Sequence, residues 1–368
     1  MSLQLTTDYH EILAQLDKID PIRYGKSRNF INGAVTQLSP YISRGVIDTR
    51  TVFEHLVKRG FSYYQLEKFV QQLCWREYFQ RVWQSLGDGI NRDIKQQQEQ
   101  IEHRALPKVL VDANTSIQAI DKGIEELYDS GMMHNHMRMY TAFLSCNVGR
   151  AHWSAPAKWM YYHLLDGDWA SNALSWQWVA GSFSTKKYIA NQENINNYTR
   201  STQRGTYIDL SYEALAAVEM PSIWQDTIAP NFTTALPTTA LPVLDPSLPL
   251  LIYNYYNLSP TWRKDEVANR VFLLEPSLFE QYPVADKCID FAMKLAKNIN
   301  DIQVYVGSFG ELKALYQGHS IYFKEHPLNK HYKGLEDQRN WIVDGEATGS
   351  FFSFWKKNEK QIRKMAGN

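Results

Sequence analysis

The chain has 368 residues, of which 44% are hydrophobic and 21% charged, and Lys+Arg and Asp+Glu both number 39. This length exceeds that of one typical core and indicates two domains, while zero formal net charge excludes a global basic field that would draw the chain onto nucleic acid. Three scattered cysteines form no disulfide framework or metal-binding spacing, and no signal peptide precedes them, so we expect a cytoplasmic protein.

The first 220 residues predict a mostly helical domain. Apolar residues recur at helical spacing in four segments, at residues 8–19, 51–59, 65–86 and 116–128. Residues 21–41 are rich in Gly, Asn, Ser and Arg and predict a polar loop. That loop ends at Ser39-Pro40, which is typical of an N-cap followed by the first helical residue.

Residues 221–249 contain six prolines and predict a semi-rigid extended linker or wrap. Beyond it, in residues 250–368, short apolar runs of strand type alternate with helical patterns. The runs are LLIYNYY, RVFLLEP, IQVYVG, SIYFKE and NWIVDG. This alternation predicts a small α/β domain with a parallel, Rossmann-like sheet. The tail FFSFWKKNEKQIRKM predicts a last amphipathic helix.

Polar and aromatic side chains gather between residues 131 and 200. Five of the eleven tryptophans (Trp153, Trp159, Trp169, Trp176, Trp178) occur there beside Asn135, Arg138, Asp166, Asp168 and Asn172. This mixture is typical of a pocket for a flat ligand with polar edges. His134 and His136 diverge at i and i+2 on a helix and gain no carboxylate or thiolate, so we assign no metal. Asp166-Gly167-Asp168 is compatible with a cation site or with an ordinary helix cap.

The motifs MHNHMRM and LLDGDWASNALSWQW closely resemble the flavin-binding core of the DNA photolyase/cryptochrome family, in which MHNRLRM is followed by DGDxAxNxxxWQW. Upstream, LSPYISRG is similar to the family's SRLSPYLxxG loop and CWREYF to its ELIWREFY helix. Downstream, RVFLLEPSLFEQYPVADKCIDFAMKLA resembles a strand and helix of the α/β domain that normally comes first. The resemblance therefore implies a circularly permuted member: a helical FAD-binding domain (1–220), a linker (221–249) and an α/β domain (250–368).

The resemblance implies FAD as the cofactor, with an antenna chromophore left open. Arg138 and Asp166 match a charge pair beside the isoalloxazine ring, which is worth burying only when both partners are hydrogen-bonded. Asp168 matches the acid on the flavin's imide side, and Asn172 the residue beside its N5. The other matched cofactor positions are Asn135, Arg76 and a phosphate and ribityl loop formed by Tyr24, Thr36, Leu38 and Ser39.

The resemblance also implies catalytic and substrate residues. Trp176 and Trp153, with Asn172, match the catalytic positions, the two tryptophans being the first members of a chain that reduces photoexcited flavin. The third, surface member has no obvious counterpart, so the chain either ends early or exits through another aromatic such as Trp159, Trp169 or Tyr162. The cavity for a flipped-out pyrimidine dimer is matched by Trp75, Met139 and Trp178, with Gln72 replacing a family Glu and His136 an Arg. Gln can bond a thymine carbonyl but offers no acid or anion.

The implied function is light-driven repair of UV-induced pyrimidine lesions by reduced FAD, in a monomer that binds damaged DNA and no membrane. The alternative is a cryptochrome-like photoreceptor or a redox flavoprotein without repair. A third interpretation, a structural helical protein without cofactor, requires the whole motif match to be accidental. A DNA-facing basic rim would come from Arg44, Arg50, Lys186, Lys187, Arg200 and Arg204.

Overall fold

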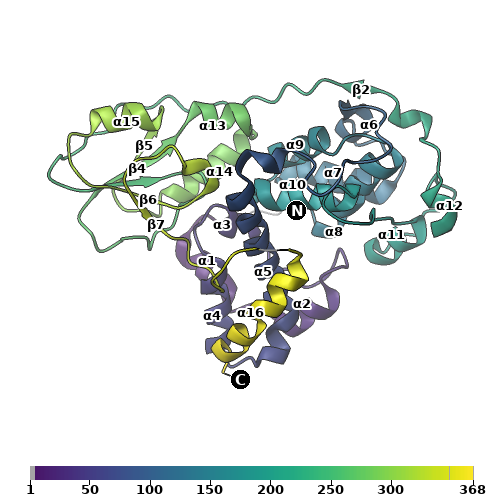
Figure 1. Ribbon diagram of the computed structural model, residues 1–368, viewed down its shortest axis with the longest axis horizontal. Helices are drawn as coiled ribbons and strands as arrows, with labels where there is room; N and C mark the ends of the chain where they lie inside the picture. The colour runs from purple at the N-terminus through teal and green to yellow at the C-terminus, as the bar shows by residue number, and fades with distance from the viewer. Residues whose placement is uncertain (1–4, 348, 368) are drawn as a thin grey trace. The chain divides into compact units, whose positions relative to one another are not determined.

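The computed structural model describes residues 5–347 and 349–367, which form two compact units (Figure 1). The first unit comprises residues 20–35 and 85–232. The second comprises residues 5–19, 36–84 and the chain from Thr233 to its described end. The units therefore follow spatial contacts and not chain order, and the boundaries at residues 220 and 249 stay a prediction.

The first unit is helical and is organised around one buried helix, α10 (Trp169–Ala180). Nine of its twelve residues are buried, as is typical of a helix surrounded by other elements. Its neighbours include α8 (Asn135–Phe143), the π-helical turn η2 (Leu144–Val148) and α9 (Ser154–His163). The other elements are α2 (Pro21–Ser27), η1 (Gly87–Asn91), β1 (Leu106–Pro107), α6 (Lys108–Val111), α7 (Gln118–Ser130), α11 (Gln192–Thr199), α12 (Tyr212–Ala216), η3 (Ser222–Trp224) and β2 (Thr227–Ile228).

Helix α2 corrects the prediction of a polar loop over residues 21–41. The Asp20 side chain accepts a hydrogen bond from the backbone N–H of Arg23, and Pro21 occupies the first helical position. An N-cap acid followed by proline nucleates a short helix even where apolar periodicity is weak. The next helix, α3 (Ser39–Ser43), begins at Ser39 itself, with Leu38 at the N-cap, so the predicted cap was wrong by one residue.

Five parallel strands form the sheet of the second unit, in the order β5-β4-β3-β6-β7. They are β3 (Leu250–Tyr253), β4 (Asn269–Leu274), β5 (Ile302–Val306), β6 (Ile321–Lys324) and β7 (Leu335–Asp337). Parallel neighbours require crossover connections, which here contain α13 (Pro276–Gln281), α14 (Asp286–Ala296) and α15 (Phe309–Leu315). The predicted parallel α/β fold is confirmed.

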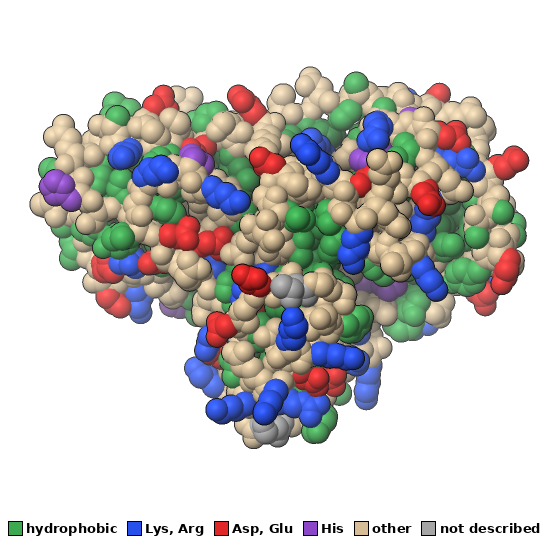
Figure 2. Space-filling model, in the orientation of Figure 1, with side chains coloured by type: hydrophobic (Ala, Val, Ile, Leu, Met, Phe, Trp, Pro, Cys, Tyr) green, Lys and Arg blue, Asp and Glu red, His purple; other side chains and the backbone are tan. Residues whose placement is uncertain are grey.

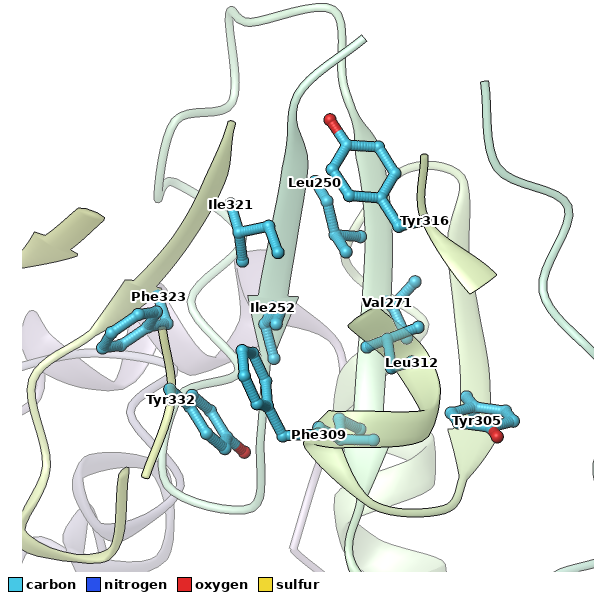
Figure 3. Packing of buried hydrophobic residues seen from close by; sticks show 11 residues of the cluster. Leu250, Ile252, Val271, Tyr305, Phe309, Leu312, Tyr316, Ile321, Phe323 and Tyr332 are labelled. Carbon is cyan, nitrogen blue, oxygen red and sulfur yellow. The ribbon is translucent and has the colours of Figure 1, made fainter. Parts of the chain in front are cut away.

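Helix α15 closes one face of this sheet (Figure 3). Leu250 and Ile252 of β3 point to the same side as Phe309 and Leu312 of the helix, within one buried hydrophobic cluster. The intervening residue Leu251 points to the opposite face and is buried too. Burial on both faces explains why these strands read as continuous apolar runs and not as an alternating pattern.

The other α-helices of the second unit are α1 (Tyr9–Leu16), α3, α4 (Thr49–Lys58), α5 (Tyr63–Leu86, to residue 84) and α16 (Phe351–Met365). The run NWIVDG, predicted as a strand, is irregular. Its apolar residues Ile342 and Val343 are fully buried, and the Ile342 N–H donates to Glu77 on α5 at 2.8 Å. The run therefore packs on a helix, and the last strand, β7, lies upstream of it.

Within the described chain, no helix has both the length and the apolar character that a membrane span requires. The fold class predicted from the sequence, a mostly helical part followed by a parallel-sheet α/β part, is confirmed by the arrangement of these elements.

Candidate functional site

A buried ion pair marks the polar centre of the first unit. Nη2 of Arg138 lies 2.9 Å from both carboxylate oxygens of Asp166, and its Nε donates to the Met133 carbonyl. The Asp166 side chain is only 4% exposed, whereas that of Arg138 is 23% exposed. The carboxylate therefore depends on the guanidinium for its compensation, while the guanidinium keeps an open edge.

Asp168 and Asn172 connect the start of α10 to its surroundings. The Asp168 carboxylate accepts from the Ala170 N–H and the Ser171 hydroxyl, so it caps the helix. Asn172, one turn later, donates its amide N–H to the Ala157 carbonyl of α9 at 2.8 Å. These contacts favour the helix-cap interpretation for Asp168 of the Asp166-Gly167-Asp168 turn.

The N-terminal turn of α8 carries Asn135, His136 and Met139. Asn135 is exposed and its amide lies 3.9 Å from the Met139 sulfur. The His136 ring packs against Tyr198 at 4.8 Å between centroids. Burial, helped by the nearby His134 and Arg28, lowers the pKa of His136 to about 4. His136 is therefore a neutral imidazole at physiological pH, whereas the Arg it replaces in the family pattern would be a cation.

The tryptophans of the first unit differ in accessibility. Trp153 and Trp176 are 0% and 2% exposed, but Trp178 is 39% exposed and lies 5.7 Å from the Tyr188 ring. Two indoles are therefore shielded from solvent, as internal electron carriers would be. The third presents an aromatic face on which a base could stack.

The remaining matched positions divide between the units. Tyr24 lies on α2 of the first unit, and burial raises the pKa of its phenol to about 12. Arg76 of α5 donates to the Ser43 hydroxyl of α3 at 2.8 Å, which fixes the two helices of the second unit together. The other five matched positions in that unit are Thr36, Leu38, Ser39, Gln72 and Trp75.

Trp75 has a partner that the sequence did not indicate. The ring of Phe351, at the start of α16, stacks on it with centroids 3.8 Å apart and planes 12° apart, while Tyr78 meets it edge-on at 5.8 Å. Phe351 is 3% exposed, but Trp75 is only partly buried. One face of the Trp75 ring is thus backed by α16. No local pattern could reveal this contact, because the two residues lie far apart in the sequence.

Arg44 is a correction to the expected basic rim. It is fully buried, with its guanidinium 3.7 Å from the Tyr255 ring centroid and 5.0 Å from that of Tyr256. Tyr256 in turn stacks on His326 at 4.4 Å. Because these tyrosines follow β3 and His326 follows β6, the side chains occupy the carboxyl-end crevice where the strand order reverses, a usual ligand position in such sheets. We therefore derive no role for an antenna chromophore there.

The donor set of the first unit fits a flavin. Arg138 is a guanidinium with an open edge beside Asp166, and the amides of Asn135 and Asn172 add neutral donors and acceptors. A flavin ring offers alternating acceptors and donors along its pyrimidine edge above a flat apolar surface, which this combination of side chains can complement.

Comparisons with known proteins agree with this geometry. Residues 69–237 match the family model described as FAD binding domain of DNA photolyase. The chain is 27% identical over 191 residues to a deoxyribodipyrimidine photo-lyase of Alkalihalophilus pseudofirmus, covering 50% of this chain and 40% of that protein. To the protein of the same name from Synechococcus it is 31% identical over 169 residues, covering 43% and 35%. It thus spans about two fifths of the length of these relatives.

A solved bacterial class III photolyase from Agrobacterium tumefaciens aligns at 27% identity with a TM-score of 0.39, over 47% of this chain and 38% of that one. The matched family segment contains both the Trp75 helix and the Arg138–Trp178 region. The resemblance seen in the motifs and the expectation of FAD are therefore confirmed: residues 69–237 match the FAD-binding domain of DNA photolyases, and FAD is the cofactor.

Proposed function

We propose that this protein repairs UV-induced pyrimidine lesions in DNA by light-driven electron transfer. The observation that carries the proposal is that the first unit combines two shielded indoles, Trp153 and Trp176, with an accessible one, Trp178. FAD, when bound and reduced, supplies the photoexcited electron. The protein's own task is to hold the cofactor, to receive an unstacked base and to keep water away from the donors.

Each side chain has a physical role in this proposal. Arg138 and Asp166 hold the flavin ring, and Asn172 and Asp168 line its edge. Trp178 offers a ring face that replaces the stacking that a flipped pyrimidine loses, which is worth about 1–3 kcal/mol per base. Gln72 and neutral His136 supply hydrogen bonds without charge. The sheet of the second unit is proposed to be the family's α/β domain in permuted order.

Damaged DNA is the proposed partner, and α16 offers a surface for its backbone. Phe352, Lys356, Lys360 and Lys364 recur every four residues, so they share one face, and all four are exposed. Figure 2 shows Lys and Arg side chains gathered around this helix. The stripe begins beside Trp75, whose ring centroid lies 6.4 Å from that of Phe352. A cationic row beside a stacking residue suits the phosphates that flank an unstacked base.

A specific observation favours a second candidate, a photoreceptor or redox flavoprotein without repair. Gln72 stands where the family's dimer-repairing members carry a Glu, so the pocket has no acid to assist ring splitting. Introducing that acid discriminates the two: Gln72→Glu should raise the repair yield if a dimer binds there. If the protein is a photoreceptor without repair activity, Gln72→Glu should leave the repair yield unchanged.

The deciding experiment is a repair assay on protein whose flavin has been reduced chemically. An oligonucleotide with one pyrimidine dimer is illuminated with blue light, and restored thymines are counted by chromatography. Trp178→Ala should lower substrate affinity about 5- to 100-fold, the loss of one stacked base. Leu241→Ala, at a side chain 67% exposed, is the control and should change nothing. Intact dimers after illumination of wild-type protein would refute repair.

A further inference from the structure

The indole of Trp153 is hydrogen-bonded to a carboxylate. Its Nε1 lies 2.7 Å from Oδ1 of Asp93, and the Trp153 side chain is fully buried. The Asp93 side chain is 14% exposed. The buried indole N–H of Trp153 therefore donates to a carboxylate, that of Asp93, which is partly exposed to solvent.

Three other buried indoles of the first unit donate to neutral acceptors. Trp169 donates to the amide oxygen of Asn91, Trp159 to the Tyr128 hydroxyl and Trp224 to the Tyr207 hydroxyl. A neutral oxygen is thus sufficient to satisfy a buried indole here. A charged acceptor at Trp153 is therefore more than is needed to satisfy the hydrogen bond of a buried indole.

Asp93 is held in place for this contact. Its Oδ2 accepts the backbone N–H of Gln98 at 3.0 Å, and the Gln98 side chain binds the Trp153 backbone N–H at 2.9 Å and the Ala151 carbonyl at 2.8 Å. His152 lies 3.4 Å from Oδ1 through Nε2. The carboxylate and the indole are therefore fixed by the same loop, which keeps their separation constant.

Loss of one electron changes the acidity of an indole. The neutral ring holds its Nε1 proton firmly, but the radical cation is a strong acid. A carboxylate at hydrogen-bond distance is then a ready base, because proton transfer needs only that geometry and a matched acceptor. An amide or a hydroxyl in the same place would accept the hydrogen bond but would not keep the proton.

We propose that Asp93 is the proton acceptor of photo-oxidised Trp153, an inference that rests on the electron route of the proposed function. When an electron leaves Trp153 toward the cofactor through Trp176, the Nε1–H bond breaks and the proton passes to Oδ1 of Asp93. The products are a neutral indolyl radical and a protonated carboxyl. A thiol reductant later returns one electron, and Asp93 returns the proton.

This transfer prolongs charge separation. The electron cannot return directly to a neutral indolyl radical without also forming an indole anion, which is unfavourable in a buried site. Recombination must therefore wait for the proton. The step compensates for the missing third tryptophan, because the charge is neutralised at Trp153 and does not need to reach a surface indole.

The test uses the full-length protein with oxidised FAD and a thiol reductant, excited by a blue flash. Transient absorption separates the indole radical cation from the neutral radical by their bands. In wild type we expect the neutral radical. Asp93→Asn keeps the shape and the hydrogen bond but removes the base, so formation of the neutral radical should slow by at least about 100-fold. Asp112→Asn, at an exposed carboxylate paired with Lys108, should behave as wild type.

A dark measurement shows that the variant is intact. With indole ¹⁵N labelling, the Trp153 Nε1–H resonance, assigned from Trp153→Phe, should move upfield in Asp93→Asn but persist. Unchanged deprotonation in Asp93→Asn, or wild type that forms no tryptophan radical, overturns the inference. Repair by chemically reduced protein does not use Trp153, so that assay tests the proposed function separately.

Discussion

The Arg138–Asp166 pair allows the sharpest test of the flavin-site geometry, because its two partners are unequally buried. Asp166 is 4% exposed and Arg138 23% exposed. Arg138→Met leaves an anion in a dry site, whereas Asp166→Asn leaves a cation that water can still reach. We therefore expect the two single substitutions to differ although they break the same pair.

The magnitudes follow from this asymmetry. Removing one partner of a buried pair costs about 3–5 kcal/mol, and we expect Arg138→Met to fall in that range. Asp166→Asn loses a charged hydrogen bond that water partly replaces, at about 1.5–3 kcal/mol. The double variant leaves no buried charge, so it should be more stable than Arg138→Met alone. The coupling energy of this double-mutant cycle then gives the interaction energy between the two side chains.

The assay is urea unfolding followed by circular dichroism, with and without excess FAD. The difference between the two series reports cofactor affinity, because a ligand bound to the folded state alone adds RT ln(1+[L]/Kd). Lys108→Met is the control: it removes one partner of an ion pair that is 51% and 44% exposed and should cost less than about 1 kcal/mol. Strictly additive costs, or an Arg138→Met variant no worse than Asp166→Asn, would refute the reasoning.

Three further predictions concern the second unit. Burial raises the pKa of Glu77 to about 7, so the contribution of this carboxyl to stability is fully present below about pH 4.5 and is lost as pH rises through 7. Glu77→Gln should remove a loss of about 3 kcal/mol between about pH 4.5 and pH 8 in urea unfolding. Phe351→Ala should destabilise the protein by about 3–5 kcal/mol in the same assay, as for other buried phenylalanines. Replacing Lys356, Lys360 and Lys364 by Ala should weaken DNA binding and reduce its log–log salt slope by up to about 3, measured by anisotropy.

Each of these predictions has a control. If the stability of Glu77→Gln varies with pH in parallel with that of wild type, a group other than Glu77 causes the pH dependence. Phe352→Ala, at a side chain 61% exposed, should cost no more than about 0.5 kcal/mol, and an equal loss in both variants would contradict the role of the Trp75 stack. Substitution of three other exposed lysines, Lys297, Lys313 and Lys330, should leave the salt slope unchanged.

Local patterns predicted most of the elements. The helices at 9–16, 49–58, 63–86 and 118–130 and the four main strands came from apolar periodicity, which depends only on neighbouring residues. Two errors share one cause. Residues 21–27 became helical through a cap at Asp20, and residues 340–345 became irregular because Glu77 takes up the Ile342 N–H. In both places a single hydrogen bond outweighed weak periodicity.

The candidate site likewise contains residues that the sequence identified and one residue whose position only packing decided. Arg138, Asp166, Asp168 and Asn172 were recognisable from the sequence because their motifs are short and contiguous, so family membership and FAD could be inferred from them. Their individual roles stay predictions. Arg44, in contrast, looked like one more surface cation, and only packing against Tyr255 placed it inside.

The sequence by itself therefore determined most of the secondary structure, the family resemblance and the cofactor, because these depend on residue types at short, regular spacing. The tertiary structure decided which partners the key side chains meet: Phe351 on Trp75, and Asp93 on Trp153. Such contacts join residues far apart in the chain, and their energy comes from geometry that no local pattern encodes.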